Sequence, residues 1–164
     1  MDGSKGASWR LHPLRVRYQE TDRMGVVYHA NYINWFEIGR TEWIRAAGVS
    51  YESIEASGLL LPVTELDCEF LQPAKYDDTL LICTRIASLS PIRMAFASEV
   101  RHVGEADWER CAKTGGSSAA EPPGSLLVRG GTRHVWVNRD WKPVRLDRAA
   151  PGVYALLEKL GGSG

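Results

Sequence analysis

One long amphipathic helix, expected over residues 31–47, constrains this chain more than any other feature. Large apolar side chains recur within it at helical spacing: Tyr32, Trp35, Phe36, Trp43, Ile44 and Ala47. Asn31 is a suitable cap for its N-terminus, and Gly48 a suitable stop. A helix with such an aromatic stripe must bury it against another layer.

The rest of the chain reads mainly as strands. Alternating apolar and polar residues predict strands over residues 11–20, 65–70, 79–89, 93–102 and 126–137. In the second of these, Leu66, Cys68 and Phe70 form the apolar side. Two shorter helices are expected, at 49–56 with Ser50 as its cap and at 151–160. The predicted fold class is therefore α+β, with one long helix against about five antiparallel strands.

Composition sets the expected boundaries. Residues 9–160 are expected to form a single domain, and the small polar residues 1–8 a disordered leader. Gly, Ser and Pro accumulate between residues 104 and 124, which predicts a long mobile hairpin loop. One helix leaves sheet edges and the other sheet face uncovered, so a homo-oligomer is expected.

Two features of the long helix concern its packing. Glu37 with Arg40, and Glu42 with Arg45, are spaced three apart and predict ion pairs on a solvated flank. Gly39 lies mid-helix, where it costs up to about 1 kcal/mol relative to alanine. Close approach of another backbone would offset that cost, and the alternative is that the glycine is simply tolerated.

Charge and composition exclude several classes of function. Twenty Lys and Arg balance twenty Asp and Glu, so the chain has no basic field for nucleic acid. No apolar run reaches the roughly 18 residues of a membrane span. Cys68, Cys83 and Cys111 contain no CxxC pair, and the four histidines lack metal-ligand spacing. Reduced cysteines, a cytoplasmic location and no metal or bound cofactor are expected.

The candidate site is the run from Tyr18 to Tyr32. Asp22 is the candidate catalytic carboxylate, because an exposed aspartate is ionised at neutral pH and lies here just before Gly25 and a helix start. The alternative for Asp22 is an ordinary turn-forming residue. His29 would bind a carbonyl, move a proton or orient Asp22, or simply be a loop histidine. Tyr18 would position Asp22 or close a pocket, and equally fits an inward-facing strand aromatic.

The start of the helix supplies candidate electrophilic groups. Unpaired N–H groups near residues 28–31, with the positive end of the helix dipole, would stabilise an oxyanion unless Asn31 occupies them as a cap. The candidate substrate-binding residues are Gly25, Val27, Tyr28, Asn31 and Arg93. Arg93, with Arg101 and Arg133, would bind nucleotide phosphates or form a solvated strand face. No GxGxxG, P-loop or GxSxG motif is present.

The run from Thr21 to Tyr32, preceded by Tyr18, resembles the signature of the 4-hydroxybenzoyl-CoA thioesterase family. The pattern Tyr18, Asp22 and His29 is most similar to the acyl-CoA thioesterases associated with the Tol-Pal system. The sequences of residues 35–48 and 72–78 also resemble this subgroup. This resemblance implies a hot-dog fold, a site at a dimer interface, and dimers that often pair into tetramers.

The resemblance also implies a reaction. Asp22 would act as general base or nucleophile, assisted by Tyr18 and His29, with the backbone near Tyr28 and His29 holding the thioester oxygen. The expected activity is hydrolysis of acyl-CoA to a free acid and coenzyme A. Alternatives are an acyl-carrier-protein or naphthoyl-CoA thioesterase, a non-catalytic acyl-binding module, and a dehydratase on the same fold.

Overall fold

The computed structural model describes residues 7–161, so most of the predicted leader, residues 1–6, lies outside the described residues. Its strands are β1 (Trp9–Arg15), β2 (Val63–Phe70), β3 (Thr79–Leu89), β4 (Arg93–His102), β5 (Ser117–Ala119) and β6 (Ser125–Val135). Its helices are α1 (Ala30–Ala46), α2 (Tyr51–Ala56), α3 (Glu105–Lys113), α4 (Leu146–Ala149) and α5 (Pro151–Leu160), with a 3₁₀ turn at Tyr18–Glu20.

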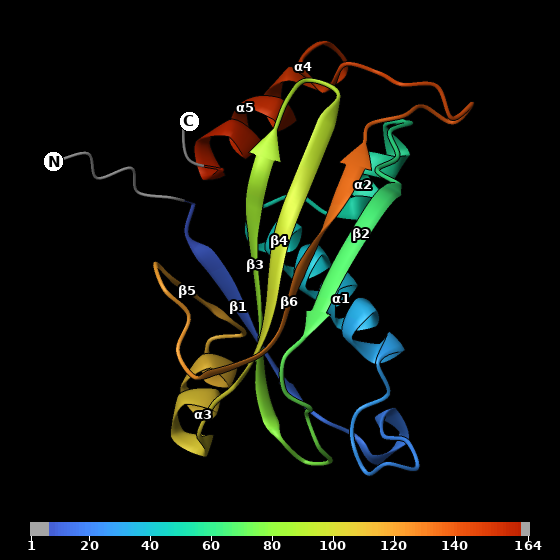
Figure 1. Cartoon of the computed structure of the whole chain (residues 1–164). Coiled ribbons are helices and arrows are strands. Elements are labelled where there is room, and N and C mark those ends of the chain that lie inside the picture. The colour runs from blue at the N-terminus through green and yellow to red at the C-terminus, as the bar shows by residue number, and fades with distance from the viewer. Residues whose placement is uncertain (1–6, 162–164) are drawn as a thin grey trace, which may run out of the picture.

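The six strands form one antiparallel sheet in the order β2-β6-β4-β3-β1-β5, and α1 runs along one face of it (Figure 1). Strand β4 explains the layering, because its buried residues alternate strictly with more exposed ones. Met94, Phe96 and Val100 point into the core beneath α1, with 2 % exposure or less. The expected long helix on an antiparallel sheet is confirmed, with six strands rather than five.

The middle of α1 lies very close to β3. A β-carbon on Gly39 would clash with the Thr84 hydroxyl and come within 2.9 Å of Ile82 Cγ2. On either side of this contact, Trp35, Phe36 and Ile44 are almost fully buried. The glycine is therefore required by the packing of the helix on the sheet, and the close neighbours are side chains of β3 rather than the backbone that the sequence predicted.

The predicted helix caps and ion pairs of α1 and α2 are confirmed only in part. Gly48 has a positive φ of 90° just beyond α1, and Ser50 caps α2 by accepting the Ser53 N–H. Asn31 was the wrong cap: the cap position is His29, and the Asn31 side chain donates to the Glu20 carbonyl instead. The Glu42–Arg45 ion pair is confirmed, whereas Arg40 is buried and forms no ion pair with Glu37.

The first strand is shorter than expected, since it ends at Arg15 and not at residue 20. Val16 bonds to the backbone of Asp77 and Asp78, and the chain then turns through Tyr18–Glu20. The Glu20 carboxylate causes this turn, because it accepts the Arg17 N–H at 2.8 Å. The turn also corrects the interpretation of Tyr18 as an inward-facing strand residue, because its side chain is 77 % exposed.

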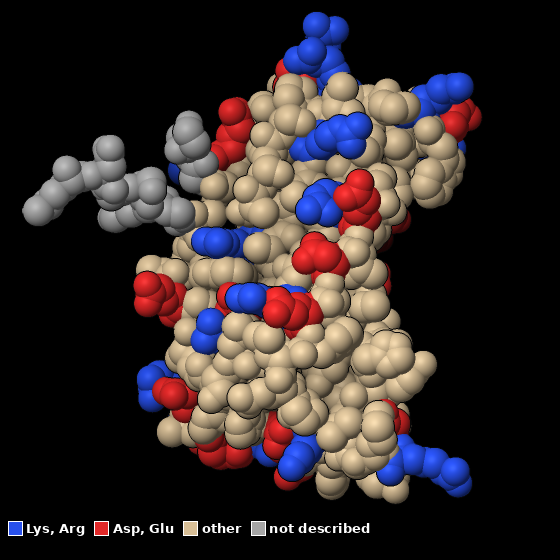
Figure 2. Space-filling model, viewed as in Figure 1, with Lys and Arg blue, Asp and Glu red and all other residues tan. Residues whose placement is uncertain are grey.

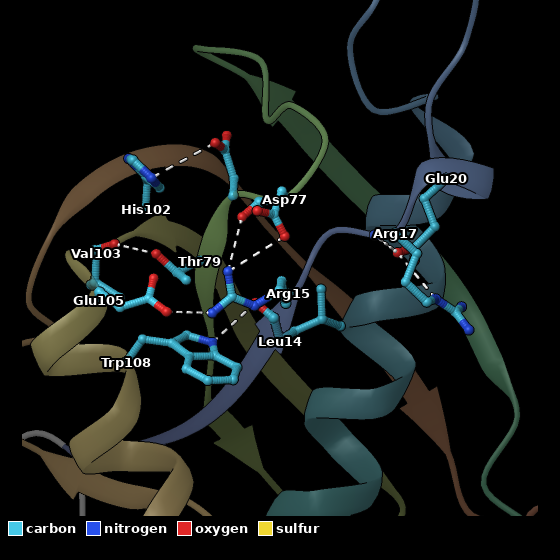
Figure 3. A network of polar contacts seen from close by, with 11 residues as sticks. Leu14, Arg15, Arg17, Glu20, Asp77, Thr79, His102, Val103, Glu105 and Trp108 are labelled. Carbon is cyan, nitrogen blue, oxygen red and sulfur yellow. Dashed lines mark hydrogen bonds and ion pairs between the residues drawn. The ribbon is translucent and has the colours of Figure 1, made fainter.

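The segment 104–124 is not the hairpin loop that its composition predicted. Residues 105–113 form α3, with acidic residues in the first turn and basic residues in the last. Figure 3 shows how Arg15 holds this helix: the guanidinium pairs with Glu105 at 2.5 Å, lies near Asp77, and stacks on the Trp108 ring. The prediction failed because Gly, Ser and Pro dominate only after residue 114, where β5 pairs with β1.

The sheet face away from α1 is only partly covered, by α3 near one end. Ion pairs cross its strands, including Arg133–Glu65 at 2.9 Å and Arg129–Glu69 at 2.7 Å. On the face seen in Figure 2, basic and acidic side chains are interspersed rather than gathered by sign. Arg101 pairs with Glu99 along the same strand, β4. Arg101 and Arg133 therefore belong to an internally paired strand surface.

We predict that Gly39→Ala destabilises the protein. Overpacking against Thr84 and Ile82 costs about 1–3 kcal/mol, which outweighs the gain of up to about 1 kcal/mol from alanine's helix propensity. Urea unfolding measures the difference. Gly152→Ala in α5 is the matched control, because its β-carbon meets no atom within 4 Å, and it should leave stability unchanged or raise it. Equal stability of Gly39→Ala and wild type would contradict the close contact.

Candidate active site

The predicted site region folds as a tight hairpin directly before α1. Thr21 pairs with Val27, the Asp22 N–H donates to the Val26 carbonyl at 2.9 Å, and the Gly25 N–H donates to the Asp22 carbonyl at 3.0 Å. Gly25 has a φ of 77°, a conformation that glycine adopts without strain. This turn fixes the position of Asp22 relative to the helix start.

The Asp22 carboxylate has a structural role and spare capacity. Its Oδ1 accepts the Met24 N–H at 2.8 Å, which is the turn-forming contact that the sequence offered as an alternative. Within residues 7–161 its carboxylate makes no other hydrogen bond or ion pair, so Oδ2 retains its acceptor sites. The side chain is partly exposed.

Two backbone donors at the start of α1 are unengaged. The Tyr28 N–H donates to the Glu20 carbonyl and the Asn31 N–H to the Tyr28 carbonyl. The N–H groups of His29 and Ala30 have no acceptor among the described residues, and no side chain caps the helix. The available donors are thus His29 and Ala30, rather than Tyr28 or Asn31.

A buried carboxylate anchors this hairpin to α1. Glu20 is 6 % exposed, and its Oε2 accepts the Trp35 indole N–H at 2.8 Å while Oε1 accepts the Arg17 N–H. Its backbone carbonyl accepts from the Tyr28 N–H and from the Asn31 side chain. Both ends of Glu20 therefore hold the loop against the first turns of the helix.

A second anchor lies on the other side of the loop. The Ala74 carbonyl accepts the Val27 N–H at 2.8 Å, and the Ala74 N–H donates to the Tyr32 hydroxyl at 3.0 Å. Burial raises the pKa of Tyr32, so its hydroxyl keeps its proton. The hairpin is thereby fixed between α1 and the segment that follows β2.

A hollow of about 220 Å³ opens next to the start of α1. Its lining residues are Val26, Val27, Tyr32, Phe70, Leu71, Gln72 and Pro73. The His29 ring stands edge-on to Phe70, with 6.2 Å between ring centroids, and stacks at a tilt on Tyr28. Of the predicted binding residues, Val27 lines this hollow and Tyr28 lies at the adjoining helix start, next to the predicted catalytic residue His29.

The structure does not bring every predicted residue to this point. Asp22 is not among the lining residues of the hollow, and it lies across the hairpin from Val26 and Val27. The Tyr18 ring packs on Tyr76. Arg93 lies at the far end of β4, seven residues or about 23 Å from Val100 in the core behind the hollow. Arg93 is therefore excluded from the site within one protomer.

The sequence interpretation missed Glu20 and Phe70. Glu20 reads as an ordinary polar residue, and no local pattern indicates that an indole fifteen residues later is its partner. Phe70 was expected on the apolar side of its strand, and its rings do face Tyr32 and His29. The sequence signal there was the alternation of Leu66, Cys68 and Phe70, and only the strand order shows that this strand lies at the edge of the sheet.

Similarity to known proteins identifies the superfamily of this chain. The profile described as "Thioesterase superfamily" matches residues 24–108. The chain belongs to the thioesterase superfamily. It is 29 % identical to the putative acyl-CoA thioesterase YneP of Bacillus subtilis over 147 residues, which cover 89 % of this chain and 93 % of that protein. It is 36 % identical to the acyl-CoA thioester hydrolase YbgC of Escherichia coli over 88 residues, 54 % of this chain and 66 % of that protein.

The fold assignment rests on solved structures as well. A crystal structure of the DHNA-CoA thioesterase from Staphylococcus aureus superimposes with a TM-score of 0.77 and 29 % identity, covering 93 % of this chain and 90 % of that one. The expected hot-dog fold is confirmed, and this superfamily member is a thioester hydrolase. The superfamily match begins two residues after Asp22, so it does not itself include that carboxylate.

Within residues 7–161, no three His, Cys, Asp or Glu side chains are grouped as metal ligands. None of the described helices is long and apolar enough to cross a membrane.

We predict that Glu20→Gln destabilises the thioesterase by about 1–3 kcal/mol. The three groups that face the carboxylate oxygens are the Arg17 backbone N–H, the Arg17 Nε and the Trp35 indole N–H. All are donors, and an amide side chain offers only one acceptor oxygen. Thermal and urea unfolding measure the loss. Glu109→Gln on the exposed side of α3 is the control and should behave as wild type. Wild-type stability of Glu20→Gln would show that these contacts do not anchor the loop.

Proposed function

We propose that this chain is an acyl-CoA thioesterase that uses Asp22 as its catalytic carboxylate. The observation that carries the proposal is the hairpin before α1, which holds a carboxylate with a free oxygen close in the chain to two unengaged N–H donors. Similarity to YneP and YbgC, whose names specify acyl-CoA, supports the choice of substrate.

In the proposed reaction, the Asp22 carboxylate drives the attack on the thioester and the N-terminus of α1 stabilises the oxyanion. Asp22 removes a proton from water as it attacks the thioester carbonyl, or attacks the carbonyl itself to form an anhydride that water then opens. The carbonyl oxygen gains negative charge, which the His29 and Ala30 N–H groups and the helix N-terminus stabilise. The C–S bond breaks, the thiolate of coenzyme A takes up a proton, and a free acid remains.

Other residues are assigned supporting roles in this proposal. Gly25 shapes the turn, Val27 forms a wall of the hollow, and Asn31 holds the loop through the Glu20 carbonyl. His29 and Tyr28 form the rim beside Phe70. The exposed Tyr18 would approach substrate only from outside the protomer, and Arg93 is left out.

We propose that two copies pair through β2, the edge strand next to the hollow. Its apolar side faces the same way as α1, yet Leu66 is 43 % and Phe70 51 % exposed because the helix does not reach the edge. A second β2 would satisfy the free edge and cover these side chains. Pairing of such dimers by their open sheet faces would give the homotetramer that the resemblance implies.

A second candidate substrate is an aromatic acyl-CoA. The similarity to the DHNA-CoA thioesterase and the aromatic lining by Tyr32 and Phe70 favour it. A panel of straight-chain acyl-CoA, aromatic acyl-CoA and acyl-carrier protein ranks these alternatives by kcat/KM.

The placement in the cell and in a subgroup also stays a proposal. Cys68, Cys83 and Cys111 are free thiols, which suits a reducing cytoplasm. The Tol-Pal-associated subgroup is proposed on the resemblance of Tyr18, Asp22 and His29 and of residues 35–48 to its members.

We predict that Asp22→Asn lowers kcat for acyl-CoA hydrolysis at least about 100-fold. An asparagine oxygen still accepts the Met24 N–H, so the turn remains while the base and nucleophile are lost. Release of free thiol measures the rate, and circular dichroism checks the fold. Asp140→Asn, on an exposed loop, is the control. Wild-type turnover by Asp22→Asn would refute the proposed mechanism.

We predict that Leu66→Glu converts the dimer to monomers, because it places a charge in the centre of the proposed contact. Sedimentation equilibrium gives the mass, and thiol release gives the activity, which should fall with dissociation. Asp67→Lys changes the opposite side of the same strand and should remain at least dimeric. A monomeric wild type, or a dimeric Leu66→Glu, would exclude pairing through this side of β2.

A further inference from the structure

A buried arginine stands in the middle of α1 without a counter-charge. Arg40 is 7 % exposed, one turn beyond Phe36, on the side of the helix that faces β6. It forms no ion pair with any acidic side chain among residues 7–161, and its Nε has no hydrogen-bond partner. Arginine does not deprotonate in proteins, and an isolated buried cation is costly. A buried arginine without a counter-charge is suited to binding an anion.

Arg40 is tied to β6 through a short network of polar side chains. Its Nη1 donates to Thr132 Oγ1 at 3.4 Å, and Thr132 Oγ1 lies 2.8 Å from His134 Nε2. The His134 Nδ1 faces the Leu61 carbonyl at 3.3 Å, so Nδ1 must carry the proton and Nε2 must accept from Thr132. These contacts engage Nη1, the Tyr51 hydroxyl lies within reach of the guanidinium, and Nε is left without a partner among the described residues.

His134 cannot serve as a second cation in this place. Burial, reinforced by the nearby Arg40 charge, lowers the pKa of His134 to about 4. The imidazole is therefore neutral at physiological pH, and its two nitrogens are both engaged. The positive charge of the site belongs to Arg40 alone.

A cavity of about 410 Å³ opens onto this arginine. Its floor is formed by Arg40 and His134, and Tyr51 lies beside the guanidinium. One part of its wall is apolar and comes from α2 and the following segment: Ile54, Leu59, Leu61, Pro62 and Val63. A cavity that combines this apolar wall with a single buried cation suits a ligand with an apolar body and one acidic end.

We propose that this cavity is an acyl-recognition subsite in which Arg40 binds a carboxylate carried on the acyl group of the substrate. The inference rests on the proposed thioesterase function and names its substrate class as thioesters with a carboxyl group distant from the sulfur. The planar guanidinium pairs with a carboxylate through two parallel hydrogen bonds, and the Tyr51 hydroxyl offers a third donor.

The charges around the cavity favour a monoanion over the phosphates of coenzyme A. Glu37 and Glu55 also line it, and both are exposed. A group with several negative charges would meet these two carboxylates and only one cation. The nucleotide end of the substrate is thereby assigned elsewhere, and the acyl end to this cavity.

The edge-to-edge dimer explains how the cavity would meet a reacting thioester. Val63, at one end of β2, lines the cavity, whereas Phe70, at the other end, lines the hollow beside His29. Two antiparallel copies of β2 place the Val63 end of one beside the Phe70 end of the other. The cavity of one subunit then adjoins the candidate catalytic hairpin of its partner.

The test compares paired thioesters that differ only in the far end of the acyl group. Succinyl- and butyryl-CoA, adipoyl- and hexanoyl-CoA, and suberoyl- and octanoyl-CoA are assayed by thiol release with the dimeric protein. For at least one length, wild type should prefer the carboxyl-ended member. Arg40→Met should lower that preference, as a ratio of kcat/KM values, roughly 10- to 100-fold. Arg110→Met, on the exposed face of α3, should retain the wild-type ratio.

Direct binding separates this subsite from catalysis. Calorimetry should detect adipate binding to wild type more tightly than hexanoate, and Arg40→Met should weaken adipate binding roughly 10- to 100-fold. Arg40→Lys keeps the charge without the paired donors and should fall between the two. Glu37→Gln should strengthen adipate binding, because it removes a negative charge from the lining of the cavity.

The outcomes distinguish the two proposals. Hydrolysis without carboxyl preference, together with no adipate binding, overturns the subsite and leaves the thioesterase function intact. Adipate binding without hydrolysis of any thioester overturns the function and leaves an anion site. If Arg40→Met dissociates the dimer and lowers both members of each pair equally, Arg40 binds a partner carboxylate and the subsite is refuted.

Discussion

The packing of α1 on the sheet is the contact on which the other features depend. A helix is about 10 Å wide, whereas six strands span about 24 Å, so α1 covers only part of one face. It lies closest at Gly39, where no side chain would fit above Thr84. This position leaves the apolar side of β2 exposed, places the helix start beside the hairpin of Asp22, and buries Arg40 over β6.

The two buried charged residues near α1, Glu20 and Arg40, differ in how far their hydrogen bonds are satisfied. Glu20 has N–H donors on both carboxylate oxygens, from Arg17 and Trp35, so its burial is balanced and it serves to hold the loop. The Arg40 Nη1 donates one long hydrogen bond of 3.4 Å to the Thr132 hydroxyl, and its Nε has no hydrogen-bond partner. A satisfied charge stabilises one conformation, while an unsatisfied one marks a place where a ligand gains from binding.

Local periodicity was a reliable guide where an element packs against one surface along its whole length. The strands at 79–89 and 93–102 occur with the expected bounds, and α1 differs by one residue at each end. Prediction failed where one particular side-chain contact, local or distant, overrides the residue pattern. The Glu20 carboxylate ends β1 early by drawing the chain into a 3₁₀ turn, and Arg15 with Trp108 holds α3 in a segment whose composition suggested a loop.

The sequence by itself determined the fold class, the superfamily signature and the candidate carboxylate, because these depend on residue order within short segments. Only the tertiary structure decided which helix-start donors are free, that Arg93 lies far from them, and that Arg40 is buried instead of paired with Glu37. Those properties arise from contacts between residues far apart in the chain. A helical spacing of three predicts that two side chains are neighbours, but the sheet beneath decides which of them faces water.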